Sequence, residues 1–125
     1  MLTNEQCIEV AEKVWGWKCK PREDRGWYIF SGIDKFNYEY TYPIDWLRDE
    51  VNSWQGFGRT VEAMFGKGKC VYISKWISHV GFNCMDTMCM DKNHISDEMI
   101  DDELEFPEHL WEATHLAALE AMKND

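Results

Sequence analysis

The sequence predicts an α+β fold, namely a three-layer α-β-α sandwich with a mostly antiparallel sheet. Apolar residues recur at helical spacing near both ends of the chain, in residues 4–15 and 107–122. Residues 36–42 alternate aromatic and polar side chains, which is typical of a strand with one packed face. The stretch "KCVYISKWISHVGF" (residues 69–82) has apolar side chains on both faces. A strand of that kind is covered on both sides, which favours helices above and below one sheet.

The chain is expected to form a single domain, residues 1–125. Its 125 residues are 45% hydrophobic, which is enough to bury a core without disulfides or a metal. Seven Trp, six Phe and five Tyr indicate tight packing between layers. We see no repeat, no linker and no domain boundary, and we expect no cofactor.

The first half of the chain predicts a helix, three short strands and two further helices. Thr3 and Gln6 have capping-box spacing at the start of helix 4–15, and Gly16 ends it. The strands follow as "WKCK", "GWYIFSG" and "KFNYEYTY", the last two joined by a turn at 31–34. The aromatic row of the third strand is interpreted as core packing, because a platform that stacks bases needs cations nearby.

The two helices after Pro43 are a short one, for which Asp45 is the cap, and a longer one preceded by Ser53. Gly56 and Gly58 weaken the first turns of the longer helix and predict that it begins only near Arg59. The segment "NCMDTMCM" (83–90) is interpreted as a further antiparallel strand. The closing helix, 107–122, is predicted to pack through Leu110, Trp111, Thr114, Ala117, Ala118 and Ala121.

The candidate metal ligands are two histidines and two cysteines spaced five residues apart, His79, Cys84, Cys89 and His94. A separation of five changes faces on a strand and advances about 140° on a helix, so the four do not line one side of either element. The tight pairs of a zinc site, such as C-x2-C, are absent from the sequence. We therefore expect no metal site and interpret the cysteines as packing residues.

Cysteine chemistry does not point to an enzyme either. The five cysteines are an odd set, which in a protein that is not exported indicates reduced thiols. Cys84 or Cys89 would need a partner among His79, His94 and His115, and no local signature of a catalytic cysteine surrounds them. Thr114 and His115 of the closing helix either satisfy core partners or line a pocket with Trp111. We expect a protein that is not an enzyme.

Charge and hydropathy limit the partners. A net charge of −10 and a pI near 4.8 exclude direct nucleic-acid binding, which requires clustered Lys and Arg. The first ten residues lack the cationic region and apolar run that are typical of a signal peptide, and no apolar run of the sequence is long enough to cross a membrane. We therefore expect a cytoplasmic protein. Residues 91–108 contain eight acids and one base, Lys92. A solvated acidic face is the preferred interpretation of this segment over a cation site.

Three segments of the chain resemble a known family. "VAEKVWGW" (10–17), "TVEAMF" (60–65) and "ATHLAALEAM" (113–122) are similar to the opening, middle and closing helices of small phage proteins grouped as the phage ABA sandwich domain. The resemblance implies an α-β-α layered fold in a phage protein and no established reaction. The stretch from Cys84 to Glu105 departs from the usual pattern, because it is richer in Cys, Met and acidic residues.

These observations lead to two hypotheses of function. The first is a phage counter-defence protein that acts in the cytoplasm of the host cell, where it binds and blocks a host protein with a basic surface. Its partner-binding residues would be Asp97, Asp101, Asp102, Glu103 and Glu105, with Phe106 or Trp111 as an apolar anchor. The second is a sponge that sequesters a nucleotide-derived signal, with cations from the set Arg48, Arg59, Lys67, Lys69 and Lys75. A zinc-binding domain or an enzyme is the third alternative, and a homo-oligomer is a further expected assembly.

Overall fold

The computed structural model describes residues 2–74, 79–84, 94–99 and 108–123, with side chains described for 2–71 and 110–123. These residues form four α-helices, one π-helical segment and six strands. In chain order they are α1 (Asn4–Glu9), η1 (Val10–Val14), β1 (Lys18–Pro21), β2 (Trp27–Ser31), β3 (Tyr40–Pro43), α2 (Ile44–Val51), α3 (Trp54–Phe65), β4 (Lys69–Ser74), β5 (His79–Cys84), β6 (His94–Met99) and α4 (Glu108–Lys123).

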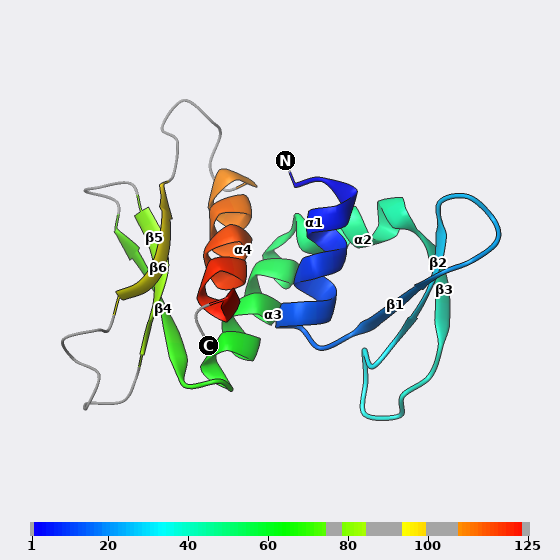
Figure 1. Ribbon diagram of the computed structural model, residues 1–125, viewed down its shortest axis with the longest axis horizontal. Helices are drawn as coiled ribbons and strands as arrows, with labels where there is room; N and C mark the ends of the chain where they lie inside the picture. Colours follow the sequence, from blue (N-terminus) through cyan, green and yellow to red (C-terminus); the bar gives the residue numbers. More distant parts are fainter. Residues whose placement is uncertain (1, 75–78, 85–93, 100–107, 124–125) are drawn as a thin grey trace.

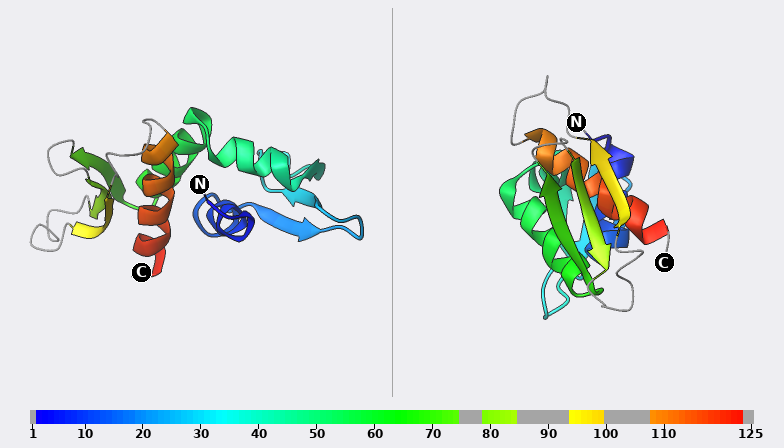
Figure 2. Two further views of the ribbon diagram at one scale, coloured as in Figure 1. Left: turned by 90° about the horizontal axis from the view of Figure 1, so that it is seen from above. Right: turned by 90° about the vertical axis from the view of Figure 1, so that its left-hand side faces the viewer.

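The strands form two separate antiparallel sheets, β1-β2-β3 and β4-β5-β6. The helices α1, α3 and α4 lie between the two sheets (Figure 1), and the view from above shows the same order (Figure 2). Helix α4 contacts β5 and β6 on one side and α3 and η1 on the other. Helix α2 contacts β3, α1 and α3.

The predicted α+β class and the antiparallel pairing are confirmed. The described residues do not establish the α-β-α order of layers. Their helices lie between two three-stranded sheets, whereas the prediction placed helices on both sides of one sheet.

The predicted first helix is present and contains an irregular turn. The Oγ1 of Thr3 accepts a hydrogen bond from the backbone of Gln6 at 3.2 Å, and the Gln6 side chain accepts one from the Thr3 backbone at 2.9 Å, so the capping box is confirmed. After Glu9 the helix widens into the π-helical segment η1, in which the N–H of Trp15 donates to the carbonyl of Val10 at 3.0 Å. Gly16, at a φ of 82°, then redirects the chain toward β1.

The sheet β1-β2-β3 packs one aromatic face against the helices. Phe30 of β2 is fully buried and lies opposite Tyr40 of β3, and the next pair on the same face is Tyr28 with Tyr42. The third strand begins only at Tyr40, because Asn37 adopts a φ of 58° that no strand tolerates. Phe36 and Tyr38 therefore lie in the preceding loop, each 60% exposed, where alternation alone had predicted a strand.

Helix α3 begins earlier than its two glycines predicted. The Ser53 hydroxyl accepts a hydrogen bond from the N–H of Gly56 at 3.0 Å, which caps the helix at Trp54. Gly56 is buried where α3 leaves the end of α2, and a Cβ atom there would lie 2.6 Å from the carbonyl oxygen of Val51. This glycine therefore permits close helix contact. Gly58 has open space around it.

The prediction of one long strand over residues 69–82 is wrong. The chain pairs with itself there, with Lys69 opposite Cys84 and Ser74 opposite His79, so β4 and β5 form a hairpin. Residues 85–90 of the predicted strand 83–90 lie outside the described residues. Part of the acidic segment 91–108 supplies the third strand, because β6 pairs with β5 from His94 to Met99 and contains Asp97 and Glu98. The interpretation of this segment as a solvated face stays a prediction.

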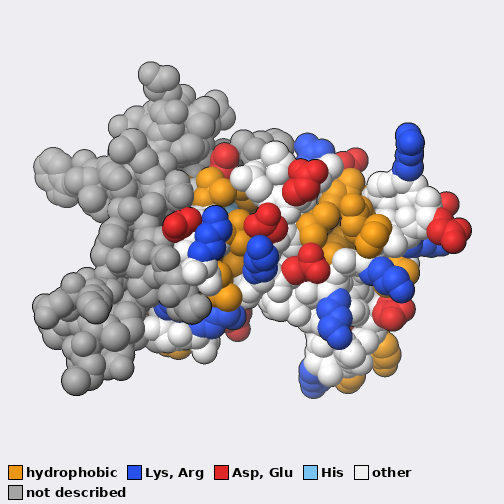
Figure 3. Space-filling model, in the orientation of Figure 1, with side chains coloured by type: hydrophobic (Ala, Val, Ile, Leu, Met, Phe, Trp, Pro, Cys, Tyr) orange, Lys and Arg blue, Asp and Glu red, His pale blue; other side chains and the backbone are white. Residues whose placement is uncertain are grey.

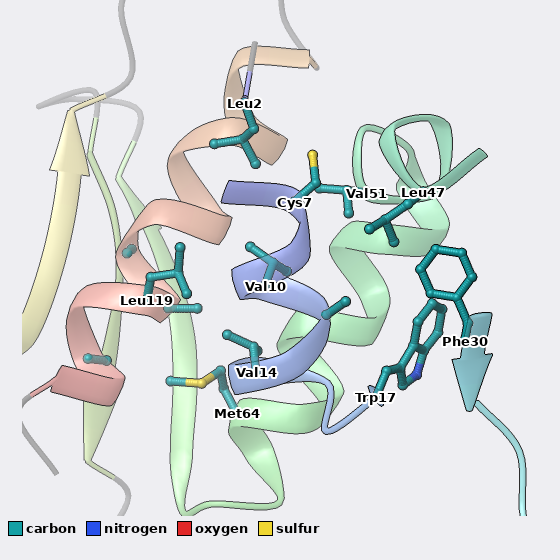
Figure 4. Packing of buried hydrophobic residues seen from close by; sticks show 14 residues of the cluster. Leu2, Cys7, Val10, Val14, Trp17, Phe30, Leu47, Val51, Met64 and Leu119 are labelled. Atoms are coloured by element: carbon teal, nitrogen blue, oxygen red, sulfur yellow. The ribbon is translucent and has the colours of Figure 1, made fainter. Parts of the chain in front are cut away.

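The core lies where α1, η1, α2, α3 and α4 pack together, and Phe30 of β2 joins it from the sheet β1-β2-β3 (Figure 4). Val10, Val14 and Met64 are at most 1% exposed at its centre. All six residues predicted to pack from the closing helix are buried, and Ala113, His115 and Leu119 are buried as well. Burial around most of its circumference is expected for a helix between two layers.

Candidate functional site

The acidic residues predicted to bind a partner are only partly within the described structure. Asp97 lies in β6, opposite Gly81 of β5, and β6 forms one edge of its sheet. Asp101, Asp102, Glu103, Glu105 and Phe106 lie outside the described residues. Helix α4, which contacts β6, follows this acidic stretch directly. Their role in partner binding stays a prediction.

Trp111 lies in the protein interior, where it is 8% exposed. Its ring meets the ring of Trp54 edge to face, with centroids 5.5 Å apart. Among the described residues, no group accepts a hydrogen bond from its buried indole N–H. Trp54 is 56% exposed and covers Trp111 from outside. A partner would therefore meet Trp54 before Trp111.

The strand register separates His79 from two of the other candidate metal ligands, Cys84 and His94. His79 begins β5 and Cys84 ends it, so their backbones are about 16 Å apart at the usual rise of a strand. His94 lies opposite Asn83, beside Cys84. Cys89 lies outside the described residues. The described residues contain no group of three His, Cys, Asp or Glu side chains arranged to hold a metal.

His115 satisfies core partners, as one of the two interpretations predicted. Its Nε2 lies 2.7 Å from the carbonyl oxygen of Val51, and its Nδ1 lies 2.8 Å from the Oγ1 of Thr60. Because a carbonyl only accepts, Nε2 carries the proton, and Nδ1 accepts a hydrogen bond from the hydroxyl of Thr60. Burial lowers the pKa of His115 from 6.5 to about 4, with the bond to Val51 acting in the opposite direction.

The thiols of the first half of the chain are poor nucleophiles. Burial raises the pKa of Cys7 from 9.0 to about 11, and the nearby charge of Arg48 opposes that shift. Burial, and then the charge of Glu12, raise the pKa of Cys19 from 9.0 to about 12. Both thiols stay protonated near neutral pH and act as packing residues. The side chains of Cys84 and Cys89 lie outside the described ones.

Three of the cations proposed for the nucleotide alternative are already paired or buried. Arg59 of α3 pairs with Glu50 at 2.6 Å, and Arg48 of α2 lies 3.4 Å from Asp45. Lys69 is only 5% exposed, whereas Lys67 is exposed in the turn after α3. Lys75 lies outside the described residues. On the face shown in Figure 3, basic and acidic side chains alternate over the described residues.

One cleft combines aromatic rings with charge, and sequence reasoning missed it. Its volume is about 380 Å³, and it is lined by Trp15, Trp17, Gly32, Ile33, Arg59, Glu62 and Ala63. The lining residues come from three separated segments: the link between η1 and β1, the loop after β2, and helix α3. We call it the tryptophan cleft. The Trp-Gly-Trp stretch at 15–17 is the only signal that the sequence gives for it.

The charged side chain of Arg59 is held against both tryptophans of this cleft. Its guanidinium carbon lies 5.5 Å from the ring centroid of Trp15 and 5.0 Å from that of Trp17. The two indoles contact each other edge to face at 4.8 Å. A guanidinium over an indole face is attracted by the electron density of the ring. Arg59 is thus fixed by Glu50 at one end and by the indoles on its face.

Comparisons with known proteins do not identify this chain. No family model, no curated protein and no solved structure matches it. The resemblance to the phage ABA sandwich domain therefore stays a prediction. Within the described part of the chain, no helix has the length and hydrophobicity needed to cross a membrane.

Proposed function

We propose that the protein is a non-enzymatic phage accessory protein that binds and blocks a host protein through an acidic surface. It acts in the cytoplasm of the host cell as a counter-defence factor, and the partner presents a basic surface. The proposal rests on the uneven charge of the chain. Residues 72–125 hold 12 of the 23 acids and only three of the 13 bases, whereas residues 1–71 hold 11 acids and ten bases.

The position of the acidic segment supports this role. Asp97 and Glu98 belong to β6 at the edge of its sheet. The chain between β6 and α4 carries Asp101, Asp102, Glu103 and Glu105. Charge concentrated at one side of a small protein attracts an oppositely charged surface and accelerates encounter with it. The nucleotide alternative has less support, because Arg59 is already neutralised by Glu50 and Arg48 lies beside Asp45.

The test compares two variants with the same change in net charge. The first is Asp101→Lys, Asp102→Lys and Glu103→Lys, which reverses the centre of the acidic segment. The control is Glu12→Lys, Glu23→Lys and Glu39→Lys, three exposed positions in the first half of the chain. Each protein is used to capture partners from a bacterial lysate at low and high salt, and to restore plating of a phage on strains that carry defence systems.

The proposal requires one captured basic protein that the control variant retains and the 101–103 variant loses. Capture should weaken as ionic strength rises, because salt screens exposed charges. Equal capture and equal plating with both variants would show that the acidic segment is not the binding surface. Analysis of small molecules released from the purified protein tests the nucleotide alternative in the same preparation.

A further inference from the structure

The tryptophan cleft has an unbalanced charge. Arg59 is paired with Glu50, and the two side chains are 28% and 22% exposed. Glu62 lines the same cleft and is exposed, and among the described residues no basic side chain pairs with it. The charge that remains for a ligand is therefore the negative charge of Glu62.

The apolar part of the cleft is suited to the stem of a long side chain. The indoles of Trp15 and Trp17 and the side chains of Ile33 and Ala63 provide apolar contact below the charged rim. Arg59 already shows that this indole pair accepts a guanidinium, at 5.0 to 5.5 Å from the ring centroids. Indole faces attract cations and repel anions. A ligand with an apolar stem and a positive planar end matches all of these features.

Contacts within the protein hold the walls of the cleft in place. The indole N–H of Trp15 donates to the Oγ1 of Thr60 at 2.8 Å, and Thr60 is held by His115 in the core. Trp17 stacks on Trp46, with centroids 6.2 Å apart and planes 18° apart. At Gly32 a Cβ atom would lie 3.4 Å from the carbonyl oxygen of Gly16, so the loop after β2 lies against the link between η1 and β1. A preformed cleft loses little entropy on binding.

We propose that the tryptophan cleft binds an arginine side chain of the partner protein, with the guanidinium near Glu62 and the stem against Trp15 and Ile33. This inference rests on the proposed function, since it names how a basic partner is engaged. It adds a second contact, on the near-neutral half of the chain, to the acidic segment. Arginine fits better than lysine, because its planar guanidinium presents a fork of N–H donors that matches the two oxygens of a carboxylate.

The direct test uses two blocked tripeptides and the full chain. Acetyl-glycyl-arginyl-glycinamide is titrated into 15N-labelled protein, and the citrulline tripeptide of the same shape without the charge is the control. Indole N–H cross-peaks report on each tryptophan separately. We expect saturable shifts at Trp15 and Trp17 with the arginine peptide, and none at Trp27 and Trp54, which are exposed elsewhere at 42% and 56%.

Glu62→Gln removes the charge and keeps the size of the side chain, and it should weaken binding of the arginine peptide about fivefold, the effect of one exposed ion pair. The matched control is Glu23→Gln, in the turn at the opposite end of the β1-β2 hairpin, which should leave binding unchanged. Equal shifts with the citrulline peptide, no saturable shift at Trp15 and Trp17, or equal affinity in Glu62→Gln would each overturn the inference.

The outcomes separate this inference from the proposed function. If the 101–103 variant loses the captured partner while Glu62→Gln binds the arginine peptide as well as the native protein, the cleft is not an arginine site and the proposed function stands. The opposite result is saturable binding of the arginine peptide that Glu62→Gln weakens, with no basic protein captured from the lysate. In that case the cleft inference stands and the proposed function fails.

Discussion

The hydroxyl of Thr60 and the Nδ1 of His115 lie 2.8 Å apart in the core, although 55 residues separate them in the chain. Thr60 also accepts the indole N–H of Trp15 at 2.8 Å. Since Nδ1 of His115 accepts, the hydrogen bonds run in one direction from Trp15 through Thr60 to His115 and on to the carbonyl of Val51. This chain of bonds joins η1, α2, α3 and α4.

The hydroxyl of Thr60 is expected to contribute strongly to stability. Thr60→Val keeps the shape and leaves the indole N–H of Trp15 and the Nδ1 of His115 without their bonds, which should lower the free energy of unfolding by about 3 kcal/mol. Thr114→Val is the matched control, because its buried hydroxyl donates only to the carbonyl of Leu110 in the same helix. Thr114→Val should lower the free energy of unfolding by about 1 kcal/mol or less. Urea denaturation measures both, and equal losses would contradict the argument.

Protonation of His115 should destabilise the protein in acid. Its pKa is about 4 in the folded state against an ordinary 6.5, so between these values the unfolded chain binds a proton that the folded protein does not. The contribution of this pKa difference to the free energy of unfolding is fully present above pH 6.5. It is lost as the pH falls to 4, and the loss is about 3 kcal/mol in total.

The measurement for His115 is the free energy of unfolding at several pH values, compared with His115→Gln. The variant lacks the titrating group, so the difference between the two proteins should grow in favour of the native protein as the pH rises from 4 to 6.5. A difference that does not change with pH over this window would show that His115 titrates alike in both states.

Two glycines of α3 should respond in opposite directions to the same substitution. In Gly56→Ala the new methyl would lie 2.6 Å from the carbonyl oxygen of Val51 and closer still to that of Glu50, so α3 must move from α2. We expect the free energy of unfolding of Gly56→Ala to fall by about 2 to 3 kcal/mol. In Gly58→Ala the new methyl has no atom within 4 Å. The higher helix propensity of alanine should raise the free energy of unfolding by about 0.5 to 1 kcal/mol. Thermal denaturation measures both effects. A change in melting temperature of the same sign in the two variants would contradict this prediction.

Local signals predicted much of this fold. The capping box at Thr3 and the packed face of the closing helix both depend on neighbours within one element, and both are confirmed. The hairpin of β4 and β5 was missed for a physical reason. Residues 75–78, which link the two strands, contain no Gly, Pro, Asn or Asp, and apolar residues on both faces continue through them.

The tryptophan cleft was not predictable from such signals. Arg59 appeared in the sequence as one of several scattered cations, and its place over Trp15 and Trp17 depends on how α3 crosses the first helix. The contact between Gly56 and the end of α2, which brings α2 and α3 close together, is likewise a tertiary property. The low helix propensity of glycine predicted a later start for α3. At Gly56 the close approach of two backbones, which only glycine permits, outweighs that low propensity.

Because η1 is a wide turn, the direction of the Trp15 side chain depends on the number of residues in that turn as well as on their identity. Its N–H reaches the carbonyl five positions back, and the N–H of Trp17 reaches Ala11 at 2.8 Å. Deleting one residue between 10 and 14 would restore ordinary helical winding and turn the following backbone by about 100°. The indole would then swing off Thr60, and the wall beside Arg59 would open although no residue in the cleft had been replaced.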